Sequence, residues 1–561
     1  MSLYSELRRR NVLKVASLYV LAGLLIVWLT WVARTQLGLP PWAEEFAVVL
    51  LLVGFPVAII FAWVYEITPS GLKKAIEVDQ TQSIVFKTGQ KLNAALIVTV
   101  GLAVVAMVAD QLLPDLAVPP PPEPPAEPTV ADVADAALGG DVPGEIVSFT
   151  LGNGLRVIVW PDNDIPNVAM YNFVRAGGRN EYPGITGLSH FFEHMMFNGT
   201  SRLEPGEFDR IMEANGGANN AYTSSDVTVY QDWFPRSALE VIFGLESDRF
   251  ANLAFDDDVI ESERGVVQSE RRSRVDNDNT GRLFEQMFAS AFIAHPYQFP
   301  VIGWPSDIAA WTKDDLETFY RRYYAPNNCT LIVVGDVTAA EIYQLTQNYF
   351  GPIPPQDPPA PVRTVEPPQT GERRFVIETE AQTPLLHIAF HAGSAADPDT
   401  LPLELLLNVL AEGDSSRLHQ RLVERESLAI SIGSYQQRGF DPGLIYFYMT
   451  LTPETDPASA EAVFFEELAA IVADGVSDAE LRKAKNILLA DHWRNLATID
   501  GKAEALGEHE VFAGGYESLF ERPGSVEALS VDALREAAAR VFRRGNATIG
   551  VLRSPASEDE S

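Results

Sequence analysis

The first hundred residues differ from the rest of the chain in how apolar and charged positions are distributed. Residues 15–33, 46–65 and 92–109 contain no charged side chain, and these stretches are 19, 20 and 18 residues long. A membrane-spanning helix needs about 20 predominantly apolar residues. Tryptophan and tyrosine residues lie near the ends of the stretches, as they do at membrane–water interfaces. The pattern therefore predicts a module of three transmembrane helices over residues 1–113.

The orientation of these helices follows from the positive charges beside them. Such charges precede the first stretch and separate the second from the third, at Arg8, Arg9, Arg10, Lys14, Lys73, Lys74, Lys87 and Lys91. The positive-inside rule then places the N-terminus in the cytoplasm and everything after residue 109 outside. The segment from Ser5 to Gly71 also resembles a three-span module of proteobacterial signalling and repeat proteins. That resemblance implies a multi-pass protein of the bacterial inner membrane, with its remaining residues in the periplasm.

Composition divides the rest of the chain. Residues 114–144 form a Pro-rich linker with stiff polyproline character, and a second Pro-rich segment covers residues 353–372. The segments between and after them, residues 145–352 and 373–555, alternate strand-like with helix-like apolar spacing. Residues 556–561 are an acidic tail.

The two long segments end alike. Residues 319–334 and 538–552 each run from the end of a predicted helix, through a turn containing Asn, into an apolar strand. A repeat of this length indicates two domains of common ancestry. We therefore predict an α+β protein, with two homologous α+β domains preceded by three transmembrane helices.

The net charge limits the classes of binding partner, and the single cysteine is expected to have a structural role. The 561 residues carry a formal net charge of −34, which would repel phosphates and excludes a nucleic-acid binder. The acidic groups form either a solvated surface or a chamber that prefers basic peptides. The single cysteine, Cys329, lies in an apolar run and is predicted to be a buried thiol.

One short segment carries the residues of a metal site: His190-Phe-Phe-Glu193-His194. On a helix, His190 and His194 are one turn apart and share a face with Glu193. Two imidazoles at this spacing bind zinc, and a carboxylate beside them can accept a proton from an attacking water. The alternative is an amphipathic helix with surface histidines.

A catalytic zinc site needs a third protein ligand. The segment 263–270 is predicted to be helical, with Glu263 and Glu270 on one face. With the H-x-x-E-H segment, this pair resembles the insulinase/pitrilysin and mitochondrial-processing-peptidase family of metallopeptidases over residues 145–555. The resemblance implies one zinc ion per chain, bound by the two histidines and Glu270. It also implies that Glu193 is the catalytic base and that Glu263 orients a histidine ligand.

Two further positions concern the substrate. Asn220 and Ala221 lie in the family-like string Gly216–Thr223. There they either align the backbone of a bound peptide or only shape a turn.

The second half departs from the family pattern. In the family, the second domain has no zinc ligands but usually supplies an arginine and a tyrosine to the substrate. The matching positions here are Val423 and Ile430, whose side chains cannot form hydrogen bonds. We therefore expect a hetero-oligomer with a zinc-less relative that supplies this pair, or otherwise a homodimer.

Together these features predict a membrane-anchored zinc endopeptidase that hydrolyses short or unfolded peptides. The alternatives are a catalytically weak or inactive peptide-binding or scaffold subunit of a hetero-oligomer, and a sensor that reports peptide binding across the membrane.

Overall fold

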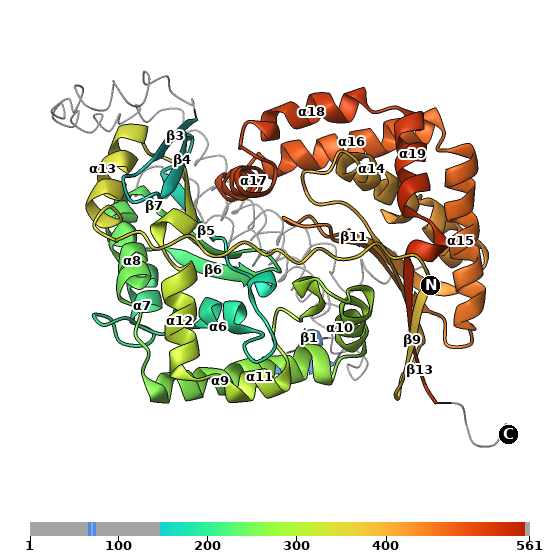
Figure 1. Ribbon diagram of the computed structural model, residues 1–561, viewed down its shortest axis with the longest axis horizontal. Coiled ribbons are helices and arrows are strands. Elements are labelled where there is room, and N and C mark those ends of the chain that lie inside the picture. Colours follow the sequence, from blue (N-terminus) through green and yellow to red (C-terminus); the bar gives the residue numbers. More distant parts are fainter. Residues whose placement is uncertain (1–64, 69–70, 75–145, 556–561) are drawn as a thin grey trace. The chain divides into compact units, whose positions relative to one another are not determined.

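The computed structural model describes residues 65–68, 71–74 and 146–555 (Figure 1). The chain separates into two compact units, residues 1–128 and 129–561. In the first unit, β1 (Tyr65–Thr68) and β2 (Gly71–Lys74) pair as an antiparallel hairpin. Among the described residues, no helix has the length and apolar character needed to cross a bilayer. The stretches predicted to span the membrane lie outside the described residues, except that the second ends at Tyr65.

The first half of the second unit is built on one mixed sheet with the strand order β3-β4-β8-β5-β7-β6. Its strands are β3 (Val147–Thr150), β4 (Arg156–Pro161), β5 (Asn167–Val174), β6 (Ala218–Thr223), β7 (Thr228–Pro235) and β8 (Cys329–Gly335). Only β4 and β8 run parallel. Cys329 begins β8 and is buried, as its apolar surroundings predict.

The helices of this half follow the apolar spacing of the sequence. They are α6 (Leu188–Met195), α7 (Glu207–Ala214), α8 (Leu239–Asn252), α9 (Asp257–Arg271), α10 (Asn279–Ala291), α11 (Pro305–Ala310), α12 (Lys313–Tyr323) and α13 (Ala339–Tyr349). The main core of this half lies between the sheet and these helices, and it contains Phe191, Phe192 and Tyr230.

The second half repeats this architecture. Its sheet has the order β11-β12-β10-β13-β9, with β9 (Arg373–Glu378), β10 (Leu385–His391), β11 (Ala429–Gln436), β12 (Leu444–Leu451) and β13 (Ala547–Arg553). In the reverse direction this order is β9-β13-β10-β12-β11, and each strand corresponds in turn to one of β4-β8-β5-β7-β6 in the first sheet. Each sheet has one parallel pair, β4 with β8 and β9 with β13. The repeat inferred from the sequence is therefore present in the topology.

The helices of the second half are α14 (Thr400–Ala411), α15 (Pro457–Asp474), α16 (Asp478–Asn495), α17 (Ile499–Phe512), α18 (Ser518–Ala528) and α19 (Val531–Val541). Figure 1 shows α14, α15, α16, α18 and α19 grouped beside the strands of their own half. In contrast, α17 packs on the other half.

The two halves exchange one helix each. Leu506 of α17 is buried in a cluster with Tyr171 and Phe173 of the first sheet. Conversely, α10 of the first half contacts β9, β10 and β13, and its Phe288 is buried with Tyr446 of the second sheet. A side chain at Gly507 would collide with the Phe173 ring, so glycine is needed for α17 to approach the sheet this closely.

Candidate metal centre

Contacts at the N-terminal end of helix α6 hold it in place. Gly187 caps the helix with φ of 89°, a left-handed conformation that favours glycine. The buried Glu181 carboxylate accepts hydrogen bonds from the backbone N–H groups of Gly187, at 2.6 Å, and Ser189, at 2.7 Å. A carboxylate at this position satisfies free N–H groups and opposes the positive end of the helix dipole.

One face of α6 is anchored in the core and the other carries the histidines. Phe191, Phe192 and Met195 are fully buried, which fixes how the helix is rotated about its axis. His190 and His194 therefore point together, with ring centroids 4.8 Å apart.

The structure brings His190, His194 and Glu270 of α9 into one cluster. The Oε2 atom of Glu270 lies 3.5 Å from Nε2 of His190 and 3.4 Å from Nε2 of His194, and one ligand atom from each residue lies within 4.8 Å of the others. In the part of the chain that the structure describes, no other three His, Cys, Asp or Glu residues meet in this way.

This geometry fits a zinc ion. Zinc–nitrogen and zinc–oxygen bonds of about 2.0–2.2 Å in a tetrahedron separate neighbouring ligand atoms by about 3.3–3.6 Å, which matches the two measured distances. Oε2 of Glu270 is also buried without a hydrogen-bond partner. A buried acceptor in that state is costly unless a ligand satisfies it.

A second set of contacts orients these candidate ligands. Oε1 of Glu263 lies 2.8 Å from Nδ1 of His194, and Asn198 donates to the other oxygen of Glu263 at 2.9 Å. If Nδ1 of His194 carries the proton, Nε2 presents its lone pair to the metal position. Glu263 thus contacts His194 rather than His190. Arg274, in the π-helical segment Arg272–Asp276, forms an ion pair with Oε1 of Glu270, whose distance from the Nε atom is 3.0 Å, and leaves Oε2 free.

Glu193 lies beside the cluster and is held by Thr223. The hydroxyl of Thr223, the last residue of β6, donates to Oε2 of Glu193 at 2.6 Å. Burial raises the pKa of Glu193, and the Thr223 hydrogen bond opposes that rise. The raised pKa favours a carboxylate that can accept and release a proton.

The two imidazoles differ in their affinity for protons. Burial, with the nearby His194, lowers the pKa of His190 to about 4. Burial also acts to lower the pKa of His194, but the hydrogen bond to Glu263 and the nearby carboxylate of Glu270 outweigh it and raise this pKa to about 9. Near neutral pH and without metal, the pair therefore carries one positive charge, on His194.

The residues expected to contact a substrate lie on the edge strand β6. Asn220 is exposed and Ala221 is half-buried, and the structure describes no strand that pairs with β6 other than β7. Next to Thr223 and Arg274 is a cavity of about 830 Å³, and Tyr435 of the second half also lines it.

Val423 and Ile430 belong to the second half of the chain, whereas the candidate zinc ligands lie on α6 and α9 of the first half. Val423 is half-buried against the second core. Ile430 lies on β11 and is 54% exposed. Neither can supply a hydrogen bond from its side chain.

Several contributors to the site were not predicted from the sequence. Glu181 contacts the start of α6, and Asn198 contacts Glu263. Thr223 contacts Glu193, and Arg274 contacts Glu270. Thr223 ends the family-like string Gly216–Thr223, which is the signal in the sequence that could have indicated it.

The chain is similar to several zinc proteases. Residues 157–303 match the family model described as Insulinase (Peptidase family M16), and residues 310–488 match the Peptidase M16 inactive domain. Zinc protease PqqE of Helicobacter pylori is 31% identical over 65% of this chain and 83% of its own length. The uncharacterized zinc protease YmxG of Bacillus subtilis is 25% identical over 71% of this chain and 96% of its own length. The crystal structure of a protease from Helicobacter pylori superimposes with a TM-score of 0.71 at 29% identity, covering 73% of this chain and 100% of that one.

Proposed function

Because the chain belongs to the insulinase (M16) peptidase family, we propose that it is a zinc-dependent endopeptidase whose metal is held by His190, His194 and Glu270. The observation that carries this proposal is the convergence of three ligand atoms within 4.8 Å, with the two distances to Oε2 of Glu270, 3.5 and 3.4 Å, fitting tetrahedral zinc. When bound there, zinc supplies Lewis acidity, which activates a water molecule and polarises the scissile carbonyl.

The chain's own residues perform the proton transfer and hold the substrate. Glu193 takes the proton of the attacking water and passes it to the leaving amine. Thr223 holds one oxygen of that carboxylate and leaves the other free. Asn220 and Ala221 lie on an edge strand to which an extended peptide can add by backbone hydrogen bonds. Such binding requires an unfolded segment, so the proposed substrates are short or unfolded peptides.

The test is a Glu193→Gln variant of the full chain. It should keep about one zinc per chain and lose peptide cleavage by about 10²–10⁴-fold, the usual contribution of a general base. Glu261→Gln, on the exposed side of α9, is the control and should cleave normally. Normal turnover by the Glu193 variant would exclude this role, and a wild-type chain without zinc would exclude the metal site.

A second candidate function is a weakly active or inactive subunit. The apolar Val423 and Ile430 and the match to the inactive-domain model favour it. In this case a zinc-less relative supplies the missing arginine and tyrosine in a hetero-oligomer, and a homodimer is the alternative assembly. Full cleavage activity of the purified chain alone would exclude the need for such a partner.

We further propose that residues 1–113 anchor the protein in a bacterial inner membrane, with the peptidase domains in the periplasm. The charge-free stretches and the flanking lysines and arginines support this topology. Periplasmic reporter fusions after residue 140 should be active and those after residue 80 inactive. The reverse result would contradict the orientation.

A further inference from the structure

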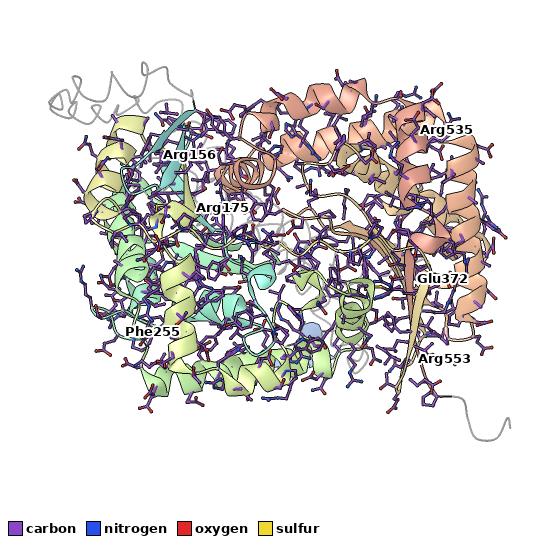
Figure 2. All side chains as sticks on the ribbon, in the orientation of Figure 1. Arg156, Arg175, Phe255, Glu372, Arg535 and Arg553 are labelled. Atoms are coloured by element: carbon purple, nitrogen blue, oxygen red, sulfur yellow. The ribbon has the colours of Figure 1, made fainter. Side chains whose placement is uncertain are left out.

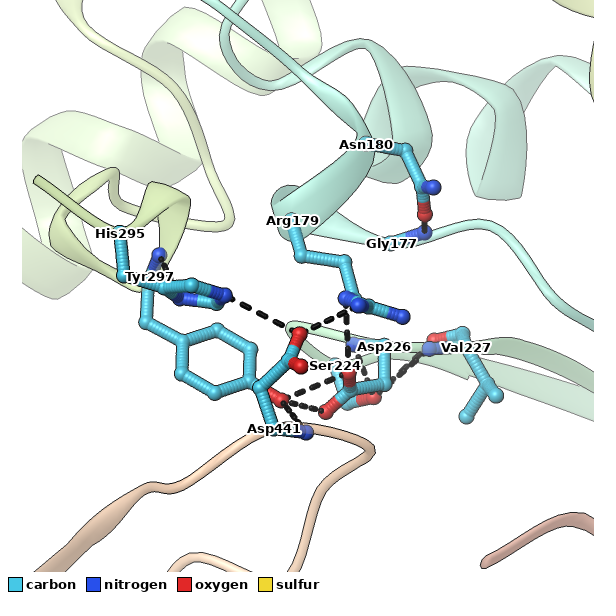
Figure 3. A network of polar contacts seen from close by, with 9 residues as sticks. All are labelled: Gly177, Arg179, Asn180, Ser224, Asp226, Val227, His295, Tyr297 and Asp441. Atoms are coloured by element: carbon cyan, nitrogen blue, oxygen red, sulfur yellow. Dashed lines mark hydrogen bonds and ion pairs between the residues drawn. The ribbon is translucent and has the colours of Figure 1, made fainter. Parts of the chain in front are cut away.

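A hairpin loop of the second half reaches into the first half. Residues 437–443 join β11 to β12, and Asp441 in this loop contacts Arg179 and His295 of the first half (Figure 3). Oδ2 of Asp441 accepts hydrogen bonds from both residues, from His295 at 3.0 Å. Gly439 of the same loop is so close that a side chain there would collide with the Tyr297 hydroxyl and the Asp226 carboxylate.

The contacts define one protonation state for His295. The backbone N–H of Tyr297 donates to Nδ1 of His295 at 3.2 Å, so Nε2 carries the proton and donates to Asp441. His295 is 2% exposed. An acceptor at residue 441 is therefore needed to satisfy a buried donor of the first half.

The same network holds the turn between β6 and β7. Tyr297 donates to both carboxylate oxygens of Asp226 in this turn, at 2.8 and 2.9 Å. Arg179 reaches the same carboxylate at 3.5 Å, and its backbone N–H donates to the Ser225 carbonyl at 2.8 Å. The Ser224 hydroxyl also accepts hydrogen bonds from the backbone N–H groups of Asp226 and Val227 within the turn. Asp441 contacts both side chains that reach Asp226 from outside the turn, since its carboxylate accepts from Arg179 and its backbone N–H donates to the Tyr297 hydroxyl at 3.2 Å.

This turn begins directly after the residue that holds Glu193. Thr223 precedes Ser224, and the hydroxyl of Thr223 donates to Glu193. A displacement of the turn would move the Thr223 hydroxyl, and a shift of about 1 Å at a reacting group can cost about 100-fold in rate.

We propose that Asp441 is a positioning residue for Glu193, so that the second half, which has no zinc ligands, sets the geometry of the base in the first half. The effect passes through Arg179, His295 and Tyr297 to the turn at Asp226, and from there to Thr223. This inference rests on the proposed peptidase function only for its kinetic consequence.

The kinetic test is a double-mutant cycle in the full chain. Asp441→Asn keeps the side-chain size but weakens acceptance from Arg179 and His295, and it should lower kcat about tenfold with a smaller change in KM and unchanged zinc content. Thr223→Val should lower kcat by a similar factor. In the Thr223→Val background, Asp441→Asn should have almost no further effect, because residues that act through one another are not additive.

The control is another ion pair between the halves that does not touch the turn. Arg156 of β4, labelled in Figure 2, donates to Glu510 of α17 at 2.8 Å. Glu510→Gln weakens the junction without altering the network around Asp226, and it should leave kcat unchanged. Additive effects of the Asp441 and Thr223 substitutions, or an equal loss in Glu510→Gln, would overturn the proposal.

A readout without catalysis separates this proposal from the proposed function. Hydrogen exchange of the backbone amides of residues 224–227 should be about tenfold faster in Asp441→Asn and unchanged in Glu510→Gln. Unchanged exchange in Asp441→Asn would refute the coupling, whatever the activity. If the wild-type chain neither binds zinc nor cleaves peptides, the proposed function fails, and the exchange result still decides the coupling.

Discussion

Replacement of Glu263 by Gln should weaken zinc binding in a way that depends on pH. The Glu263 side chain is 13% exposed and its two oxygens contact His194, at 2.8 Å, and Asn198, at 2.9 Å. Glutamine offers one acceptor for two donors and carries no charge. Loss of such an outer partner typically lowers metal affinity about 10- to 100-fold, which is about 1.4–2.8 kcal/mol.

The size of the loss depends on the proton that zinc must displace. The hydrogen bond to Glu263 and the nearby carboxylate of Glu270 raise the pKa of His194 to about 9 against the effect of burial. At pH 7 this proton competes with zinc and weakens binding by roughly 100-fold relative to high pH. The Glu263→Gln substitution lowers the pKa of His194 and so relieves part of the competition. The full loss of affinity should therefore appear near pH 9, and a smaller loss at pH 7.

Zinc affinity can be measured by competition with a chelator at both pH values. Glu261→Gln is the matched control, since it removes the same charge from α9 at a side chain that is 68% exposed and faces Arg264. The reasoning would be refuted if Glu263→Gln bound zinc as tightly as Glu261→Gln near pH 9, or if its loss were larger at pH 7.

Three other predictions follow from contacts already described. Zinc binding at pH 7 should release about one proton per site, from His194, because burial and its neighbour lower the pKa of His190 to about 4 and leave it neutral. Calorimetry in buffers of different ionisation enthalpy measures the number of protons released, and a release of none would contradict a charged His194. Gly507→Val should destabilise the fold by about 1–3 kcal/mol, since the new side chain collides with Phe173; urea denaturation would show it, with an unchanged midpoint arguing against the close packing. Glu181→Ala should cost about 1–2 kcal/mol through loss of the bonds to the start of α6, and a thermal melt that matches wild type would refute that capping role.

The sequence predicts the parts of this protein that depend on short-range spacing. His190, Glu193 and His194 share a face because of helical geometry alone, and the buried Phe191 and Phe192 place the other face of the helix against the core. The strands and helices of both halves likewise follow the apolar periodicity of the sequence.

The remaining features depend on which elements meet in space. Glu181 and Thr223 look like ordinary polar residues until the loop before α6 and the end of β6 are brought to that helix. The role of Asp441 requires two segments separated by 262 residues to meet at Arg179. The buried residues Ala503, Leu506 and Val511 of α17 lie on one side of the helix, but nothing in their spacing shows that this side packs on the sheet of the other half.

The exchange of α10 and α17 has a consequence for how the chain arose and how it can be divided. Two identical copies of one ancestral repeat would make the same reciprocal contact across a two-fold axis, as a helix-swapped homodimer. Gene fusion would then have added only the connection between them. The apolar contacts of Leu506 with Phe173 and of Phe288 with Tyr446 do not depend on that connection. Fragments separated within residues 354–370 are therefore expected to assemble in trans when co-expressed, whereas either fragment alone would expose the sheet that its partner covers.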